Sequence, residues 1–70
     1  MLPLTLADTG AEYIIKRIGG SPEVKKHLSD LGFVVGGKVS VVNTMGGNLI
    51  VNVKDSRVAV GKDMAAKILI

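Results

Sequence analysis

His27, the only histidine of the chain, stands close in sequence to two carboxylates that could join it in holding a metal ion. If residues 22–31 form a helix, Glu23, His27 and Asp30 share one side of it, because residues three and four positions apart are neighbours on a helix surface. Imidazole and carboxylate groups are suitable ligands for iron, zinc or manganese. The set contains no second imidazole and no thiolate, since the chain has no cysteine. The alternative is a histidine that covers the rim of the core and pairs with Glu23.

A glycine-rich segment, Gly32 to Lys38, matches the phosphate-binding pattern G-x-x-x-x-G-K. The next residue of that pattern is a serine or threonine that binds magnesium, and here it is Val39. The pattern also leads from a strand into a helix, whereas this segment is predicted to lead from a helix into a strand. We therefore expect no nucleotide site, and we expect the glycines to build a tight connection.

Catalysis has few residues to build on in a chain of this size. Seventy residues leave room for one domain, 1–70, and exclude a multidomain enzyme, a dinucleotide-binding fold and a TIM barrel. The four serines have one histidine to share, there is no cysteine nucleophile, and no acidic pair stands out. The sequence therefore predicts a protein that is not an enzyme.

The positive charge of the chain is modest and spread along its length. Nine Lys and Arg residues against six Asp and Glu residues give a formal charge of +3, with acidic residues interleaved among the basic ones. Small barrels that bind nucleic acid usually present aromatic stacking platforms, and only Tyr13 could serve here. The charge also suits an acidic protein surface or the anionic inner face of a membrane. We do not expect a nucleic-acid partner. A nucleic-acid-binding barrel is the third hypothesis, after two others that are given below.

Nothing in the sequence predicts direct insertion into a membrane. No apolar run approaches the roughly 18 residues that a membrane span requires. The segment from Met1 to Leu6 lacks the basic start and the long apolar core of a signal peptide. We therefore expect a cytoplasmic protein.

One short helix is predicted at about Pro22–Leu31. Ser21 is a good N-cap residue, Pro22 suits the first helical position, and apolar residues three and four positions apart form one face. Gly32 follows where a left-handed C-terminal cap is expected.

Strands are predicted on both sides of this helix, separated by glycine turns. The segment Gly46-Gly47-Asn48 is predicted as a hairpin turn and Asp55-Ser56 as a second turn, with a helical turn at 61–66. The strands are rich in Val and Ile and cover residues 12–18, 38–45, 49–53, 57–60 and 67–70. About five short strands and one helix suit a small, highly curved barrel, so the predicted fold class is mainly β.

The apolar residues Ile68-Leu69-Ile70 could leave an exposed strand edge at the end of the barrel, with only Lys67 to discourage pairing. A homodimer formed through this edge is therefore one expectation for the chain.

A series of apolar and glycine positions follows a specific order along nearly the whole chain. They are Leu6…Gly10, Ile14…Ile18-Gly19-Gly20, Val24…Leu28…Leu31-Gly32-Phe33, Gly36, Val39, Gly46-Gly47, Val58-Ala59-Val60 and Ala66-Lys67-Ile68. In this order and spacing, from about Leu6 to Ile70, the chain resembles the FeoA family of small bacterial ferrous-iron-transport proteins. The resemblance implies an SH3-like barrel that acts in the cytoplasm beside FeoB, the membrane protein with a GTPase domain that carries Fe(II).

The chain is also similar to the C-terminal SH3-like domain of iron-dependent repressors of the DtxR type. Such domains are often described as binding transition metal ions, so the resemblance implies a metal as a second expectation. No cofactor follows with certainty from the sequence.

Two main hypotheses result. The first is a non-enzymatic accessory module of bacterial ferrous iron uptake that binds and regulates the cytoplasmic part of a FeoB-type transporter. Its candidate contact residues lie on the exposed helix flank and at the hairpin tip and are Lys25, Lys26, Gly46, Gly47 and Asn48. The alternative is a transition-metal-ion-binding sensor module, in which Fe(II) or another transition metal binds through His27 with Glu23 or Asp30.

Overall fold

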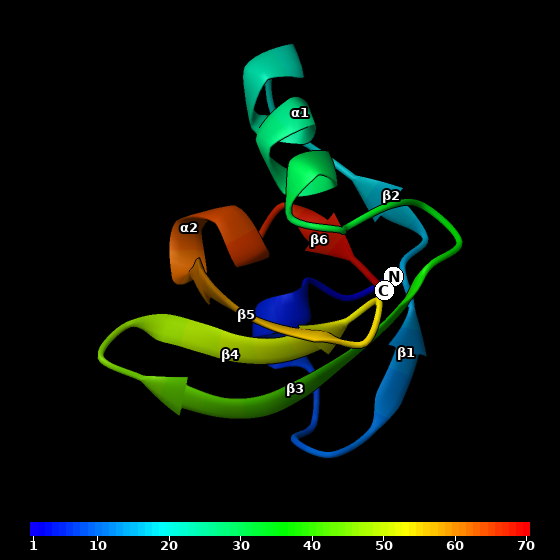
Figure 1. The fold of residues 1–70 in the computed structure, drawn as a ribbon. Helices are drawn as coiled ribbons and strands as arrows, with labels where there is room; N and C mark the ends of the chain where they lie inside the picture. Colours follow the sequence, from blue (N-terminus) through cyan, green and yellow to red (C-terminus); the bar gives the residue numbers. More distant parts are fainter.

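Six short strands and two helices follow one another along residues 1–70 in a computed structural model (Figure 1). The elements are, in chain order, a 3-10 turn η1 (Leu4–Leu6), β1 (Glu12–Ile14), β2 (Arg17–Ile18), α1 (Pro22–Asp30), β3 (Lys38–Met45), β4 (Asn48–Val53), β5 (Ser56–Gly61), α2 (Lys62–Ala65) and β6 (Ile68–Leu69). The prediction of a mainly β fold with one short helix is confirmed, and α2 is the single helical turn expected near 61–66. Neither helix has the length and apolar character needed to cross a lipid bilayer.

Both ends of α1 are capped by the residues that the sequence indicates. The Ser21 hydroxyl accepts a hydrogen bond from the Val24 N–H at 3.3 Å, and Pro22 occupies the first turn. At the other end Gly32 has a φ of +108°, and its N–H donates to the Ser29 carbonyl. The Phe33 N–H then reaches back to the Leu28 carbonyl at 2.9 Å, which completes a Schellman cap. Because Leu28 and Phe33 are both fully buried, the cap also fixes the helix to the core.

The single strand predicted over 12–18 is wrong, because the chain changes sheets at Ile15. β1 pairs with β3, whereas β2 pairs with β6. Between them Ile15 is fully buried and exchanges hydrogen bonds with the connection after α1: its N–H donates to the Gly37 carbonyl and its carbonyl accepts from the Gly36 N–H. The Lys16 N–H already donates to the Leu69 carbonyl. The bend therefore joins the two sheets into a barrel.

The larger sheet has the order β1-β3-β4-β5 and is all antiparallel. Two-residue turns connect its last three strands, and the turn residues have positive φ: +54° and +84° at Gly46 and Gly47, and +48° and +62° at Lys54 and Asp55. The predicted hairpin tip is thus confirmed, although Asn48 belongs to β4. The second turn lies one residue before its predicted place, because Ser56 pairs with Val53.

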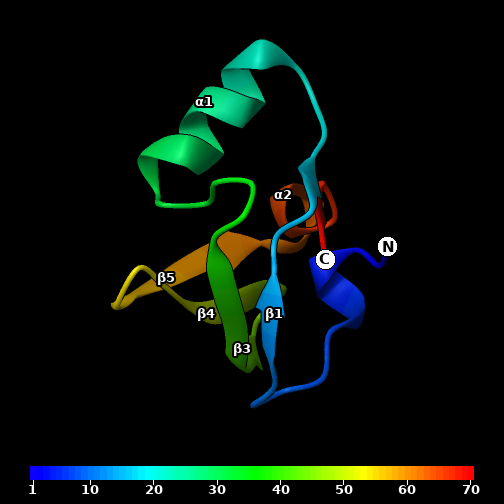
Figure 2. The same ribbon diagram turned by 90° about the vertical axis from the view of Figure 1, so that its right-hand side faces the viewer.

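The smaller sheet, β2-β6, closes the barrel together with the N-terminal residues. Leu2 and Ile70 exchange two hydrogen bonds, of 2.9 and 2.7 Å, on the side of β6 opposite β2. The exposed edge predicted at residues 68–70 is therefore wrong: this strand is paired on both sides, and a homodimer has no free edge to use there. Figure 2 shows α1 at one end of the molecule and the four-stranded sheet at the other, with α2 between them.

The interior is entirely apolar. The buried residues are Leu4, Ile15, Leu28, Phe33, Val39, Val41, Leu49, Val51, Val53, Val60, Ala65, Ile68 and Ile70. No polar or charged residue is buried.

The Lys54–Asp55 turn is a source of backbone strain that can be removed. Left-handed conformation costs a residue other than glycine roughly 1–2 kcal/mol, and Asn-Gly is the preferred pair for such a turn. We expect the double change Lys54→Asn, Asp55→Gly to raise the free energy of unfolding by about 1 kcal/mol, measured by urea denaturation. The opposite change in the other turn, Gly47→Ala, should lower it by a similar amount. A double variant no more stable than the parent would contradict this description of the turn.

Candidate functional site

The outer side of α1 carries the charged residues that the sequence analysis selected. Glu23, His27 and Asp30 are all exposed, as are Lys25 and Lys26. The opposite side of the helix packs on the barrel through Leu28 and, in part, through Val24 and Leu31. The helix therefore presents polar groups to solvent without using them in the fold.

The predicted metal ligands do not form a closed site in this structure. No three or more His, Asp or Glu side chains lie close enough together to hold a metal ion, and there is no cysteine to add. Glu23 and His27 are one turn apart on α1, and Asp30 is three residues beyond His27, as the helix requires. Metal binding by these residues stays a prediction. Because the three side chains do not gather in one place, α1 alone would supply fewer than three ligands to one ion.

The predicted hairpin tip is at a different place on the surface. Gly46, Gly47 and Asn48 are exposed at the end of the β3–β4 hairpin, beside Met45, which is 62% exposed. The Lys62 N–H donates to the Gly47 carbonyl at 3.1 Å, which ties the turn to the start of α2. In Figure 1 the tip extends sideways from the barrel, away from α1. The helix flank and the hairpin tip are therefore separate surfaces.

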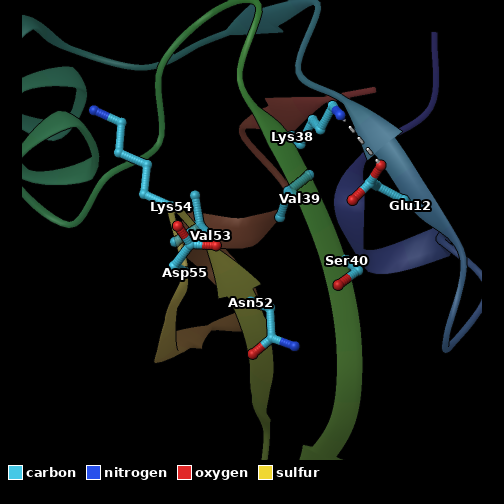
Figure 3. A pocket seen from close by; sticks show the side chains of 8 residues that line it. All are labelled: Glu12, Lys38, Val39, Ser40, Asn52, Val53, Lys54 and Asp55. Atoms are coloured by element: carbon cyan, nitrogen blue, oxygen red, sulfur yellow. Dashed lines mark ion pairs between the residues drawn. The ribbon is translucent and has the colours of Figure 1, made fainter.

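Sequence reasoning missed a hollow on the outer face of the four-stranded sheet (Figure 3). Its volume is about 590 Å³, and it is lined by Glu12, Lys38, Val39, Ser40, Asn52, Val53, Lys54 and Asp55. The register places Glu12 beside Ser40, Ser40 beside Asn52, and Asn52 beside Arg57, so one row of polar side chains crosses all four strands. The signal was present as polar residues alternating with valines in β3 and β4, but the row exists only once the strands are paired.

The hollow is suited to binding and poorly suited to catalysis. Its one ion pair, between Lys38 Nζ and Glu12 Oε1, spans 3.9 Å, and the two side chains are 70% and 65% exposed. Such exposed pairs contribute little to stability. Lys54 and Asp55 carry the other charges of the lining, while Ser40 and Asn52 offer hydrogen-bond donors and acceptors (Figure 3). No residue in it is both polar and buried, so nothing there is held in the water-excluded setting that catalytic groups need.

Known proteins similar to this chain share both its sequence pattern and its barrel. The family model described as "FeoA domain" matches residues 2–70. The curated "Putative Fe(2+) transport protein A" of Methanocaldococcus jannaschii is 33% identical over 70 residues, which is all of this chain and 85% of that protein. A crystal structure of an iron uptake regulatory protein, FeoA, superposes with a TM-score of 0.87 at 28% identity and covers 96% of this chain and 89% of that one.

Two further solved structures share the fold at lower identity. FeoA of Stenotrophomonas maltophilia, described as an SH3 domain protein and solved in complex with zinc, has a TM-score of 0.83 at 21% identity, and the match covers 99% of this chain and 88% of that one. A manganese-dependent transcriptional repressor has a TM-score of 0.85 at 19% identity, and the match covers 94% of this chain but 38% of the repressor. The SH3-like fold predicted from the sequence is confirmed.

The polar lining of the hollow should be dispensable for folding. We expect Glu12→Gln to change the free energy of unfolding by less than about 0.5 kcal/mol in low and in high salt, because the ion pair it removes is exposed. As a comparison in the neighbouring strand, Val39→Ala should cost about 2 kcal/mol through lost burial. Urea denaturation of both variants measures this. A loss of more than about 1 kcal/mol in Glu12→Gln, twice the expected limit, would show that the lining of the hollow is a structural network instead.

Proposed function

The chain belongs to the FeoA family, and from this premise we propose that it is a non-enzymatic accessory module of ferrous iron uptake. Its role in this proposal is to bind and regulate the cytoplasmic part of a FeoB-type transporter, and its place is the cytoplasm. The observation that carries the proposal is the family match over 2–70, combined with a barrel that keeps every polar and charged side chain out of its core.

The distribution of residues supports a binding role. All 13 buried residues are apolar, so the interior serves packing alone and chemistry with a ligand or partner is left to the surface. The proposal has two candidate contact surfaces, both exposed: Lys25 and Lys26 on α1, and the hairpin tip at Gly46, Gly47 and Asn48. Both can be contacted without disturbing the core. Nucleic acid is not the proposed partner, because the single tyrosine is half-buried and accepts a hydrogen bond from Asp8 at its hydroxyl.

Reversing the charge of the helix flank should weaken transporter binding. We expect Lys25→Glu, Lys26→Glu to reduce affinity for the purified cytoplasmic part of the transporter by about tenfold, since two charges at the rim of an interface each contribute under about 1 kcal/mol. NMR titration or calorimetry measures this. The matched control is Lys16→Glu with Arg17→Glu, which makes the same change in net charge on exposed residues elsewhere. If the unchanged protein gives no spectral shift at saturating transporter, in either nucleotide state, the proposal is wrong.

A second candidate function is transition-metal sensing through α1. It is favoured by two proteins of the same fold: the zinc complex of Stenotrophomonas maltophilia FeoA and the manganese-dependent repressor. On this chain the ligands would be His27 with Glu23 or Asp30, and the remaining coordination would come from water or from a partner, because no three side chains gather in the structure.

Titration with Zn(II), followed by NMR, tests this second candidate. We expect saturable shifts centred on His27, with affinity falling at least about tenfold in His27→Ala, since that change removes the only imidazole. Asp63→Asn is the control, because Asp63 lies on α2. Unchanged His27 signals at millimolar Zn(II), an excess of about a thousandfold over a micromolar dissociation constant, would remove the idea.

A further inference from the structure

We propose that the free edge of β5 binds an extended, acidic segment of the partner transporter as an additional strand. This inference rests on the proposed function and names where and how the partner is held. β5 (Ser56–Gly61) is the last strand of the β1-β3-β4-β5 sheet, and no hydrogen bond from another part of the chain reaches residues 56–60 on its outer side.

The register shows which backbone groups are free. The two-residue turn is closed by Val53 and Ser56, so these two form a hydrogen-bonded pair, and such pairs alternate along an antiparallel ladder. Arg57 and Ala59 fall at the intervening positions and therefore direct their N–H and C=O groups away from β4. Each residue carries one donor and one acceptor, so about four backbone groups face solvent in a line. This is the arrangement that an added strand uses.

The other strand edges are less suitable. β6 is paired on one side with β2 and on the other with Leu2, so it offers no edge. β1 ends the sheet opposite β5, but it is three residues long, half the length of β5. Of these three edges, only that of β5 has room for a segment that pairs over several residues.

The side chains of β5 indicate the chemistry of the segment. Arg57 is exposed, ends the polar row on the outer face of the sheet and makes no ion pair. Val58 pairs with buried Val51 on the inner face and is itself half-buried, so an apolar neighbour would complete its cover. Because side chains alternate between faces, the matching segment places a carboxylate opposite Arg57 and an apolar residue next to it, opposite Val58. The small side chain of Ala59 places no restriction on the size of the segment residue opposite it.

A second copy of the chain fits this edge less well. Two copies could pair in a register in which the free backbone N–H and C=O groups of Arg57 and Ala59 are used in both. In that register Arg57 of one copy lies opposite Ala59 of the other. The two Arg57 residues then become diagonal neighbours on the same face, with Cα atoms about 7–8 Å apart and no carboxylate between their side chains. The chain also carries a net charge of +3, which opposes self-association and favours an acidic partner.

Ala59→Pro tests the proposal, because the Ala59 N–H points away from β4 and its loss spares the internal ladder. We expect Ala59→Pro to bind the purified cytoplasmic part of the transporter at least about tenfold more weakly, while Ala59→Ser, which keeps the N–H, binds as the parent does. Arg57→Glu should weaken binding as well. Far-ultraviolet circular dichroism and urea denaturation check that each variant folds.

A second measurement needs no variant and keeps the test decisive if Ala59→Pro does not fold. In the free protein the amides of Arg57 and Ala59 should exchange rapidly with solvent, whereas those of Val58 and Val60 should be protected. In the complex the Arg57 and Ala59 amides should become protected too.

Each outcome has a distinct meaning. If the parent binds the transporter and Ala59→Pro binds equally well, with both amides unprotected, the edge proposal fails and the accessory function stands. If the parent does not bind, both fail. If protection of the two amides rises with protein concentration alone, in step with a dimer in sedimentation equilibrium, the edge is taken by a second copy and the assignment to the transporter is wrong.

Discussion

Burial of a small, purely apolar core is the interaction on which the rest of this molecule depends. A chain of 70 residues can bury only about 60% of the surface it exposes when unfolded, so few positions can be spared from packing. Here all 13 buried residues are apolar, and the fully buried Leu28 and Phe33 join the capped end of α1 to the barrel. The consequence for function is direct, since charged groups can only be placed on the outside. Recognition of a partner can use such exposed groups.

Local signals in the sequence were sufficient for the elements whose geometry is set by neighbouring residues. Ser21, Pro22 and Gly32 predicted both ends of α1 to within one residue, and two adjacent glycines located the β3–β4 turn. Long-range pairing decided the rest. The residues Tyr13, Ile14, Ile15 and Ile18 predicted one strand over 12–18. The backbone of Ile15 instead bonds to the connection after α1 and that of Lys16 to Leu69, so the strand divides. The second turn lies one residue earlier than predicted because Lys54 shares the left-handed conformation of Asp55, which aspartate tolerates but which the sequence does not predict for a lysine.

The candidate sites also divide into those that neighbouring residues predict and those that depend on long-range strand pairing. The charged stripe on α1 could be recognised from helical spacing alone, and the structure places those residues on the solvent side. The hollow and the free edge of β5 could not be recognised from the sequence, because each depends on which strands lie next to one another. The polar row is spread over 46 positions of the chain, from Glu12 to Arg57, and forms only through the strand register.

The pairing of Leu2 with Ile70 brings the two ends of the chain side by side on the barrel (Figure 1). Adjacent termini are what permits a domain to be circularly permuted or inserted into a loop of another protein. A short linker between the ends could thus move the chain break to the Gly46–Gly47 turn and leave every strand pair in place. The same geometry would let this barrel be joined to a larger polypeptide through one narrow attachment point. The matched repressor is a longer chain, of which a region of this fold makes up 38%.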